Sequence, residues 1–239
     1  MAALVEMEPD MGTACIVYGV PFLMAFLVGI PWKQVKGLFI FGIVGLAVLI
    51  IWQPYRLQRV LTTFDPWSDA QGVGYQAVQS MSTIGSGGLW GMGLGEGVSK
   101  YEYLPEAHTD FAFAIFAQEH GYLGVLLVIF MFFLLAVCCY YISLRARDIY
   151  GQILTLGIML LVVGQAVGNL FMVSGMFPVV GVPLPFISYG GSSLLVTMAS
   201  MGILLNICHH GFQPQHEHEP LPEPPAPRKS TAPPLRLVK

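Results

Sequence analysis

Charge is the scarcest property of this 239-residue chain. Asp, Glu, Lys and Arg together make up 10% of the residues and hydrophobic residues 55%, whereas soluble domains are usually about one quarter charged. From Ile149 to Cys208 the sequence contains none of these four residue types. A stretch of that length crosses a hydrocarbon core of about 30 Å twice, at roughly 20 residues per helix. The composition therefore excludes an ordinary soluble domain and indicates an integral membrane protein.

Basic patches and cysteine patterns are also missing. The net charge is −3 and no basic stripe is interleaved with aromatic residues, which excludes a nucleic-acid-binding protein. The four cysteines lie inside apolar runs, so they form neither a disulfide framework nor a zinc site and are expected to pack as small hydrophobic residues. The N-terminus lacks the pattern of a removable signal peptide. We therefore expect the membrane spans themselves to direct insertion.

The apolar runs predict an all-α integral membrane protein with about five transmembrane helices, at residues 12–30, 37–52, 121–144, 152–174 and 187–208. Lys33 and Lys36 follow the first span, and Arg145 and Arg147 follow the third. The positive-inside tendency places both of these turns in the cytoplasm. The long connection 53–110, which is expected to contain short helices, and the segment 175–186 then meet on the outer face.

Residues 1–211 are predicted to form one polytopic domain without an internal repeat. Residues 212–239 are rich in Pro, Glu and His and contain almost no aromatic residues. Such a composition cannot bury enough apolar surface to fold. We therefore expect a disordered cytoplasmic tail.

Asp110 is the first candidate for chemistry. It lies where the polar segment Leu104–Phe111 becomes an apolar helix, at the outer membrane surface, which is a suitable place for a general base. Alternatively, Thr109 or Asp110 caps the helix that follows, and this is the commoner use of such residues at a helix start. The two roles are compatible.

A break is expected inside the helix that follows Asp110. A continuous helix from Thr109 to Leu144 would be about 50 Å long, well beyond the membrane core. Gly121 is the predicted breaking point, which makes Phe111–Ala117 a short helix that dips into the outer side of the protein. Glu119 is then either a functional ionisable group with a cation or a wet cavity as its partner, or the polar end of an interfacial helix.

The segment Gly175–Pro185 and the run Ser188–Ser193 form a second constellation. Three prolines predict irregular backbone at membrane depth, tolerated only where protein or water covers it. The serines and glycines then open the last helix, whose free N–H groups suit a phosphate or diphosphate, or else they allow close helix packing. Gln165 and Asn169 share one helix face and are predicted to hydrogen-bond a neighbouring helix, with a polar cavity as the alternative.

Four motifs resemble the SEDS (shape, elongation, division, sporulation) family in order and approximate spacing: Glu8–Thr13, Gly85–Leu89, Leu104–Phe111 and Pro183–Ser193. Ala107, the run Asp65-Pro66-Trp67 and the run Gly74-Tyr75-Gln76 are more similar to the FtsW/SpoVE branch than to RodA. The resemblance extends from Glu6 to about His210. It covers only the C-terminal part of the family pattern, its last five or six of ten spans, without the front half and its Arg-rich outer motif.

This resemblance implies a peptidoglycan glycan-strand polymerase of cell division. Lipid II would be polymerised with inversion at the sugar carbon and release of undecaprenyl diphosphate, in the bacterial inner (cytoplasmic) membrane, with the active face outward and the C-terminus in the cytoplasm. Asp110 aligns with the family's essential acid, expected to act as general base, and Glu102 with a loop acid linked to activation. Further residues are expected to shape the site or to meet the diphosphate: Glu106, His108, Ser188, Gly190, Gly191 and Ser192.

The resemblance also implies partners. A class B penicillin-binding protein transpeptidase and other division membrane proteins are expected, with Phe130–Phe133 as a candidate docking face or, alternatively, a lipid contact. No cofactor and no protein-held metal are expected, because the acids are scattered, although a divalent cation shared with the lipid diphosphate stays an alternative.

The sequence leaves two rival functions open. The first is a flippase or transporter for lipid-linked precursor, which should carry ionisable residues near the bilayer midplane. The central portions of the predicted spans are uncharged, and this favours chemistry at the outer face. The second rival is an inactive, truncated protein that only binds division proteins.

Overall fold

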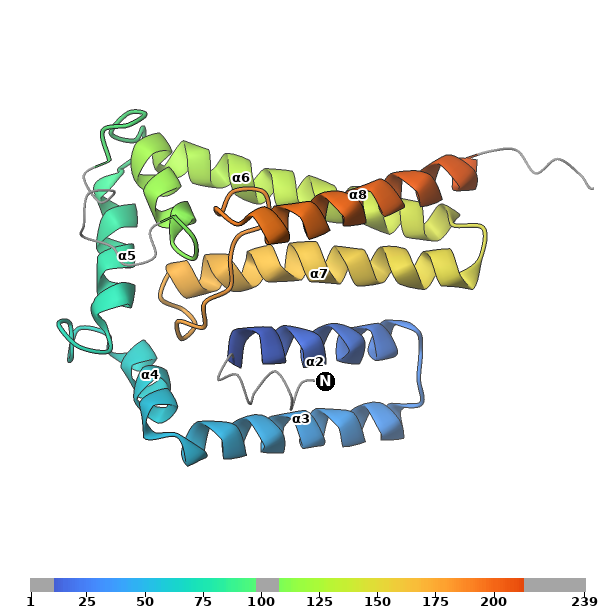
Figure 1. The fold of residues 1–239 in the computed structure, drawn as a ribbon, viewed down its shortest axis with the longest axis horizontal. Coiled ribbons are helices and arrows are strands. Elements are labelled where there is room, and N and C mark those ends of the chain that lie inside the picture. The colour runs from blue at the N-terminus through green and yellow to red at the C-terminus, as the bar shows by residue number, and fades with distance from the viewer. Residues whose placement is uncertain (1–10, 98–107, 213–239) are drawn as a thin grey trace, which may run out of the picture.

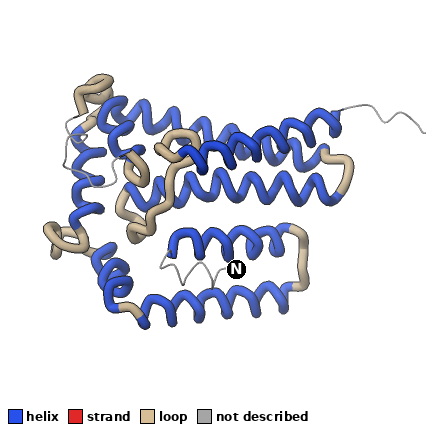
Figure 2. Tube along the Cα trace, in the orientation of Figure 1, coloured by secondary structure: helices blue, strands red, loops and turns tan. Residues whose placement is uncertain are grey.

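The computed structural model describes residues 11–97 and 108–212, and these residues form helices and loops only (Figure 2). The helices are α2 (Met11–Leu27), α3 (Trp32–Trp52), α4 (Pro54–Phe64), α5 (Tyr75–Ser86), α6 (Ala112–Arg145), α7 (Ile149–Val173) and α8 (Gly191–Phe212). Within the described ranges, α3, α6, α7 and α8 are long and apolar enough to cross a membrane, and α2 is a shorter apolar helix. This confirms the predicted all-α membrane fold with short helices in its long loop.

The two ends of the helix bundle differ in kind. The connection between α2 and α3 and the connection between α6 and α7 lie at one end (Figure 1). The helices α4 and α5 and the segment 174–190 lie at the other end. The connection 53–110 and the segment 175–186 were predicted to meet and do so there, since Arg59 Nη1 donates to the carbonyl oxygen of Val179 over 2.8 Å.

The observed helix boundaries differ from the predicted spans at several points. The first helix ends at Leu27 rather than at residue 30, with Gly29 at φ 81° in the turn that follows. The next begins at Trp32 rather than at residue 37, because the carbonyl of Pro31 already accepts the N–H of Gln34. Lys33 and Lys36 therefore belong to the start of α3 and not to the turn.

The last helix begins at Gly191 rather than at residue 187 and continues to residue 212 rather than 208. The N–H groups of Ile187 and Ser188 both donate to the carbonyl of Leu184, which closes a turn before the helix. Phe186 lies in this turn at φ 68°, outside the helical region. The run of small residues therefore forms a turn first and a helix only afterwards.

The predicted break in α6 is confirmed at Gly121, whose φ of 65° and ψ of −165° are not helical. The short helix before it reaches residue 120, three residues beyond the predicted end at Ala117. A break at membrane depth leaves carbonyl groups on one side and N–H groups on the other without helical partners.

The glycine-rich loop 87–97 supplies these missing partners on both sides of the break. The N–H groups of Met92 and Gly93 donate to the carbonyls of Gln118 and Glu119 over 3.0 and 3.2 Å. In return, the N–H of Tyr122 donates to the carbonyl of Gly88 over 2.9 Å. The loop therefore caps the end of one half of α6 and the start of the other.

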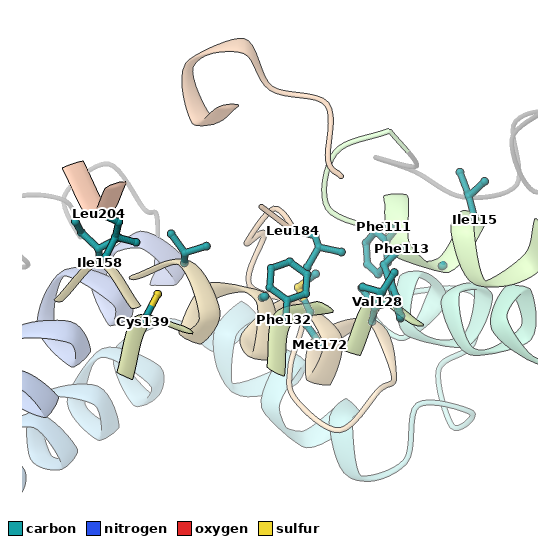
Figure 3. Packing of buried hydrophobic residues seen from close by; sticks show 14 residues of the cluster. Phe111, Phe113, Ile115, Val128, Phe132, Cys139, Ile158, Met172, Leu184 and Leu204 are labelled. Carbon is teal, nitrogen blue, oxygen red and sulfur yellow. The ribbon is translucent and has the colours of Figure 1, made fainter. Parts of the chain in front are cut away.

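The core lies where α6 packs on α7, together with the loop before α8 (Figure 3). Phe111, Met172 and Leu184 are its largest apolar side chains with almost no exposure. Phe132 also belongs to this core, whereas Phe130 and Phe133 are exposed. The candidate docking face 130–133 therefore lacks one of its aromatic side chains.

Candidate functional site

A cavity of about 710 Å³ opens between the turn before α6 and the start of α8. It brings together four residues that were predicted for the site: His108, Ser188, Gly190 and Gly191. The remaining lining comes from Tyr189 and from the apolar residues Ala112, Ile115, Ile187 and Leu194. An apolar wall beside a polar edge suits a ligand with a lipid part and a polar head.

The turn before α8 gives this cavity its shape. The hydroxyl oxygen of Ser188 accepts the backbone N–H of Leu184 over 2.7 Å, which holds the turn closed. The N–H of Tyr189 is engaged with His108, so the two lining segments are joined directly. The N-terminus of α8 then starts at the cavity, and the first N–H groups of a helix have no intrahelical acceptor.

Asp110 lies half-buried in the turn that leads into α6. Its Oδ2 atom is 3.3 Å from the position that a Cβ atom on Gly181 would occupy, so the carboxylate faces the proline-rich segment. The N-cap of α6 is Phe111, without a side-chain cap, so neither Thr109 nor Asp110 stands at the N-cap position. Asp110 does not itself line the cavity; it lies two residues after His108 and two residues before Ala112, which do.

Two amides on α7 hold the proline-rich segment in place. Gln165 Nε2 donates to the carbonyl of Pro183 over 3.0 Å. Asn169 Nδ2 donates to the carbonyl of Val182 over 2.6 Å and to the carbonyl of Asp110 over 2.8 Å. The shared helix face was predicted correctly, but the acceptors are irregular segments and not a neighbouring helix.

Ser192 lies apart from the other predicted residues. It lines a second cavity of about 290 Å³ between α7 and α8, together with Leu161, Val162, Gln165, Ser193, Val196 and Thr197. Ser192 directly follows Gly191 in α8, and neighbouring residues of an α-helix point about 100° apart, so the two face different cavities.

The acids Glu102 and Glu106 lie outside the described residues, and so do the N-terminal motif before Met11 and the tail after Phe212. Glu119 is described and is 9% exposed. Its Oε1 atom accepts the backbone N–H of Gly95 over 3.2 Å. This contact joins the end of the short helix to the loop 87–97.

Arg59 helps to hold the proline-rich segment, and the sequence analysis did not identify it. Its Nη1 atom donates to the carbonyl of Val179 over 2.8 Å, and its guanidinium lies 4.7 Å from the ring centroid of Tyr55. Arg56 lies three residues earlier and is buried. A spacing of three residues places the two arginines on one face of a helix. The sequence analysis predicted short helices within the connection 53–110 but did not locate α4 there.

Within ranges 11–97 and 108–212, no group of three His, Cys, Asp or Glu side chains is arranged to hold a metal ion. These features define a multi-pass membrane protein with a polar site at one end of the bundle: helices long and apolar enough to span a membrane, a broken helix held by a loop, and an amphipathic cavity. A family model for cell cycle proteins, FtsW/RodA/SpoVE, matches residues 1–212. The chain belongs to this family.

Curated relatives agree with this membership. The chain is 41% identical over 207 residues to a protein named "Probable peptidoglycan glycosyltransferase FtsW" from Trichlorobacter lovleyi, with 87% of this chain and 54% of the relative covered. It is 38% identical over 207 residues to stage V sporulation protein E from Bacillus subtilis, covering 87% of this chain and 57% of that protein. The chain therefore spans about half the length of the curated relatives it matches.

Two solved structures share the fold. A peptidoglycan synthase complex that coordinates polymerization and crosslinking contains a chain that matches with a TM-score of 0.71 and 31% identity, over 89% of this chain and 60% of that one. An Asp-to-Ala mutant of the rod shape determining protein RodA from Thermus thermophilus matches with a TM-score of 0.58 and 27% identity, over 89% of this chain and 54% of that one.

Proposed function

We propose that this chain polymerises peptidoglycan glycan strands from lipid II during bacterial cell division, at the outer face of the cytoplasmic membrane. The observation that carries the proposal is the half-buried Asp110, which stands two residues from both His108 and Ala112 in the lining of an amphipathic cavity. Membership of the family and the names of the relatives support it.

Asp110 is the general base in this proposal. It accepts the proton of the acceptor sugar hydroxyl while that oxygen forms a bond to the anomeric carbon of the donor. The bond from this carbon to the diphosphate oxygen breaks, and its electron pair leaves with undecaprenyl diphosphate. Attack from the side opposite the leaving group inverts the carbon. Much of the rate enhancement comes from holding the two lipid-linked reactants in line.

The cavity receives the donor lipid in this proposal. The N-terminus of α8 at Gly190 and Gly191, with Ser188 and His108, faces the diphosphate, because helix N-termini stabilise anions. The apolar side chains of Ile115 and Leu194 line the path of the polyprenyl chain. Glu102 and Glu106 remain proposed site residues in the segment 98–107. Ser192 lines the other cavity, and we expect its replacement to matter less.

A class B penicillin-binding protein is the proposed partner. The structure of a peptidoglycan synthase complex that matches this chain supports such a pairing. The exposed side chains of Phe130, Met131 and Phe133 form the proposed contact on α6. Other division membrane proteins are proposed to join the same assembly.

The test is glycan-strand formation from purified lipid II by the purified full chain with its class B partner. Asp110→Asn should abolish the polymer while the protein still accumulates in membranes. Asp148→Asn, an exposed Asp at the opposite end of the bundle, is the matched control and should keep the native rate. Equal polymerisation by native chain and Asp110→Asn would refute the role of Asp110. Transfer of lipid II across the bilayer without polymer would favour a flippase.

A further inference from the structure

Asn169 is the most completely buried amide in the site, with 0% exposure on α7. Its Nδ2 group donates to two backbone carbonyls, that of Asp110 over 2.8 Å and that of Val182 over 2.6 Å. Both partners are pure acceptors, so they require the N–H side of the amide and fix its orientation. A side-chain NH₂ group has two hydrogens, and each has its own acceptor here.

These two acceptors belong to segments that meet at the Asp110 carboxylate. The first is the turn that carries Asp110 itself, and the second is the proline-rich segment that the carboxylate faces at Gly181. One amide therefore sets the separation between the backbone that carries the acid and the backbone opposite it. Asn169 acts on the main chain of Asp110 and not on its carboxylate.

The remaining polar atom of this amide, its oxygen, has no such partner within the described ranges. Asn169 Oδ1 is buried and has no hydrogen-bond partner among the residues that the structure describes. An unsatisfied buried acceptor is unfavourable and calls for an explanation. The two donated bonds are that explanation, because no smaller or apolar side chain supplies both.

Gln165 provides a natural comparison on the same face of α7, one turn earlier. It also donates through its amide to the proline-rich segment, at the carbonyl of Pro183 over 3.0 Å. The structure gives it no bond to Asp110. Replacing Gln165 therefore removes only a bond to the proline-rich segment. Replacing Asn169 removes a bond to that segment and also the bond to the backbone of Asp110.

We propose that Asn169 is a positioning residue for Asp110: its amide holds the turn of Asp110 against the proline-rich segment and so aims the carboxylate. The catalytic consequence rests on the proposed function, but the geometric statement does not. Misplacing a reacting group by about 1 Å can lower a rate on the order of 100-fold.

The geometric statement is tested on the full chain in lipid nanodiscs labelled with ¹³C at the Asp carboxyl carbon. The chain has five Asp residues, Asp10, Asp65, Asp69, Asp110 and Asp148, and the signal of Asp110 is identified by its disappearance in Asp110→Asn. Asn169→Leu should shift or split this signal while the other four stay in place. Gln165→Leu, the same replacement one turn away, should shift the Asp110 signal far less than Asn169→Leu does, because Gln165, within the part of the chain that the structure describes, has no bond to the turn of Asp110.

The catalytic statement is tested with the same variants in the lipid II polymerisation assay. Asn169→Leu should lower kcat on the order of 100-fold with KM close to native, and Gln165→Leu should lower kcat far less. Should Asn169→Leu fail to accumulate, Asn169→Gln replaces it in both tests. That variant keeps both donors but displaces them by one methylene, so the Asp110 signal should still shift and kcat should still fall.

The outcomes separate this proposal from the previous one. A native Asp110 signal in Asn169→Leu or Asn169→Gln, or equal shifts and equal losses of kcat in the Asn169 and Gln165 variants, would overturn the positioning role. Native polymerisation by Asp110→Asn, or no polymer from any variant, would count against the proposed function. The carboxyl signal would still decide whether Asn169 aims Asp110.

Discussion

A single glycine, Gly121, allows the break in helix α6. Gly121 has φ 65° and ψ −165°, a combination that only glycine adopts readily and that costs other residues about 1 to 3 kcal/mol. A Cβ atom there would also overlap the backbone N of Gly91 and lie 2.7 Å from the carbonyl carbon of Leu89. The position therefore combines a backbone constraint with a close approach of the loop that caps the break.

We predict that Gly121→Ala lowers the free energy of unfolding by at least about 2 kcal/mol, because backbone strain and steric overlap add. Gly164→Ala on α7 is the control, since a Cβ atom there meets no atom within 4 Å and Ala favours helix. Unfolding midpoints in detergent micelles, followed by tryptophan fluorescence, measure both variants. Similar midpoints for the two variants would show that the loop 87–97 shifts to accommodate the added methyl group at little cost in stability.

Among the helices, α4 combines exposed apolar side chains with an arginine that contacts the proline-rich segment. Its apolar side chains Leu57, Leu61 and Phe64 are exposed and recur at helical spacing, which is typical of a helix lying at a membrane interface. Its arginines lie on the protein side, where Arg59 reaches the carbonyl of Val179. A hydrogen bond from a charged donor to a carbonyl typically contributes about 1.5 to 3 kcal/mol.

Removing this bond should loosen the proline-rich segment without unfolding the bundle. We predict that Arg59→Met accelerates amide hydrogen exchange at residues 176–182 by about tenfold, the equivalent of roughly 1.4 kcal/mol in local opening. Gln58→Met, on the exposed side of α4, should leave the exchange of this segment unchanged. Mass spectrometry of the exchanged peptides separates the two variants, and equal exchange in both would remove Arg59 from the support of the segment.

At the scale of the whole molecule, the bundle has one simple end and one elaborate end. Short turns with nearby basic residues, Lys33 and Lys36 beside one and Arg145 and Arg147 beside the other, form the simple end. The helices α4 and α5, the loop 87–97 and the candidate site form the elaborate end (Figure 1). The positive-inside tendency directs the simple end to the cytoplasm.

Cysteine labelling in intact cells tests this orientation. In a background with the four native cysteines replaced by Ala, Ser68→Cys should react with a membrane-impermeant maleimide from outside. Asp148→Cys should react only after the cells are permeabilised, because it lies at the simple end. The reverse pattern would place the candidate site in the cytoplasm, where it would not meet substrate presented outside.

The class of protein and the places where its helices stop being regular could be predicted from residue types alone. Hydrophobic length is a local property, so the apolar runs located the long apolar helices, with ends that differ from the observed ones by up to five residues. The break at Gly121 and the irregular segment around Pro178, Pro183 and Pro185 followed from residue types whose backbone preferences are also local. The resemblance drew attention to Asp110, and family membership is now established by comparison.

The hydrogen-bond partners that these elements find could not be predicted in this way and depend on the folded arrangement. The links from Asn169 to Asp110 and from Arg59 to Val179 join residues far apart in the chain, and no periodicity specifies such pairs. Capping of α6 by the loop 87–97 and the turn that moves Ser192 away from Ser188 depend on close approach of backbones in three dimensions. Hydrogen-bond donors and acceptors pair by distance and direction, and those are set once the helices have packed.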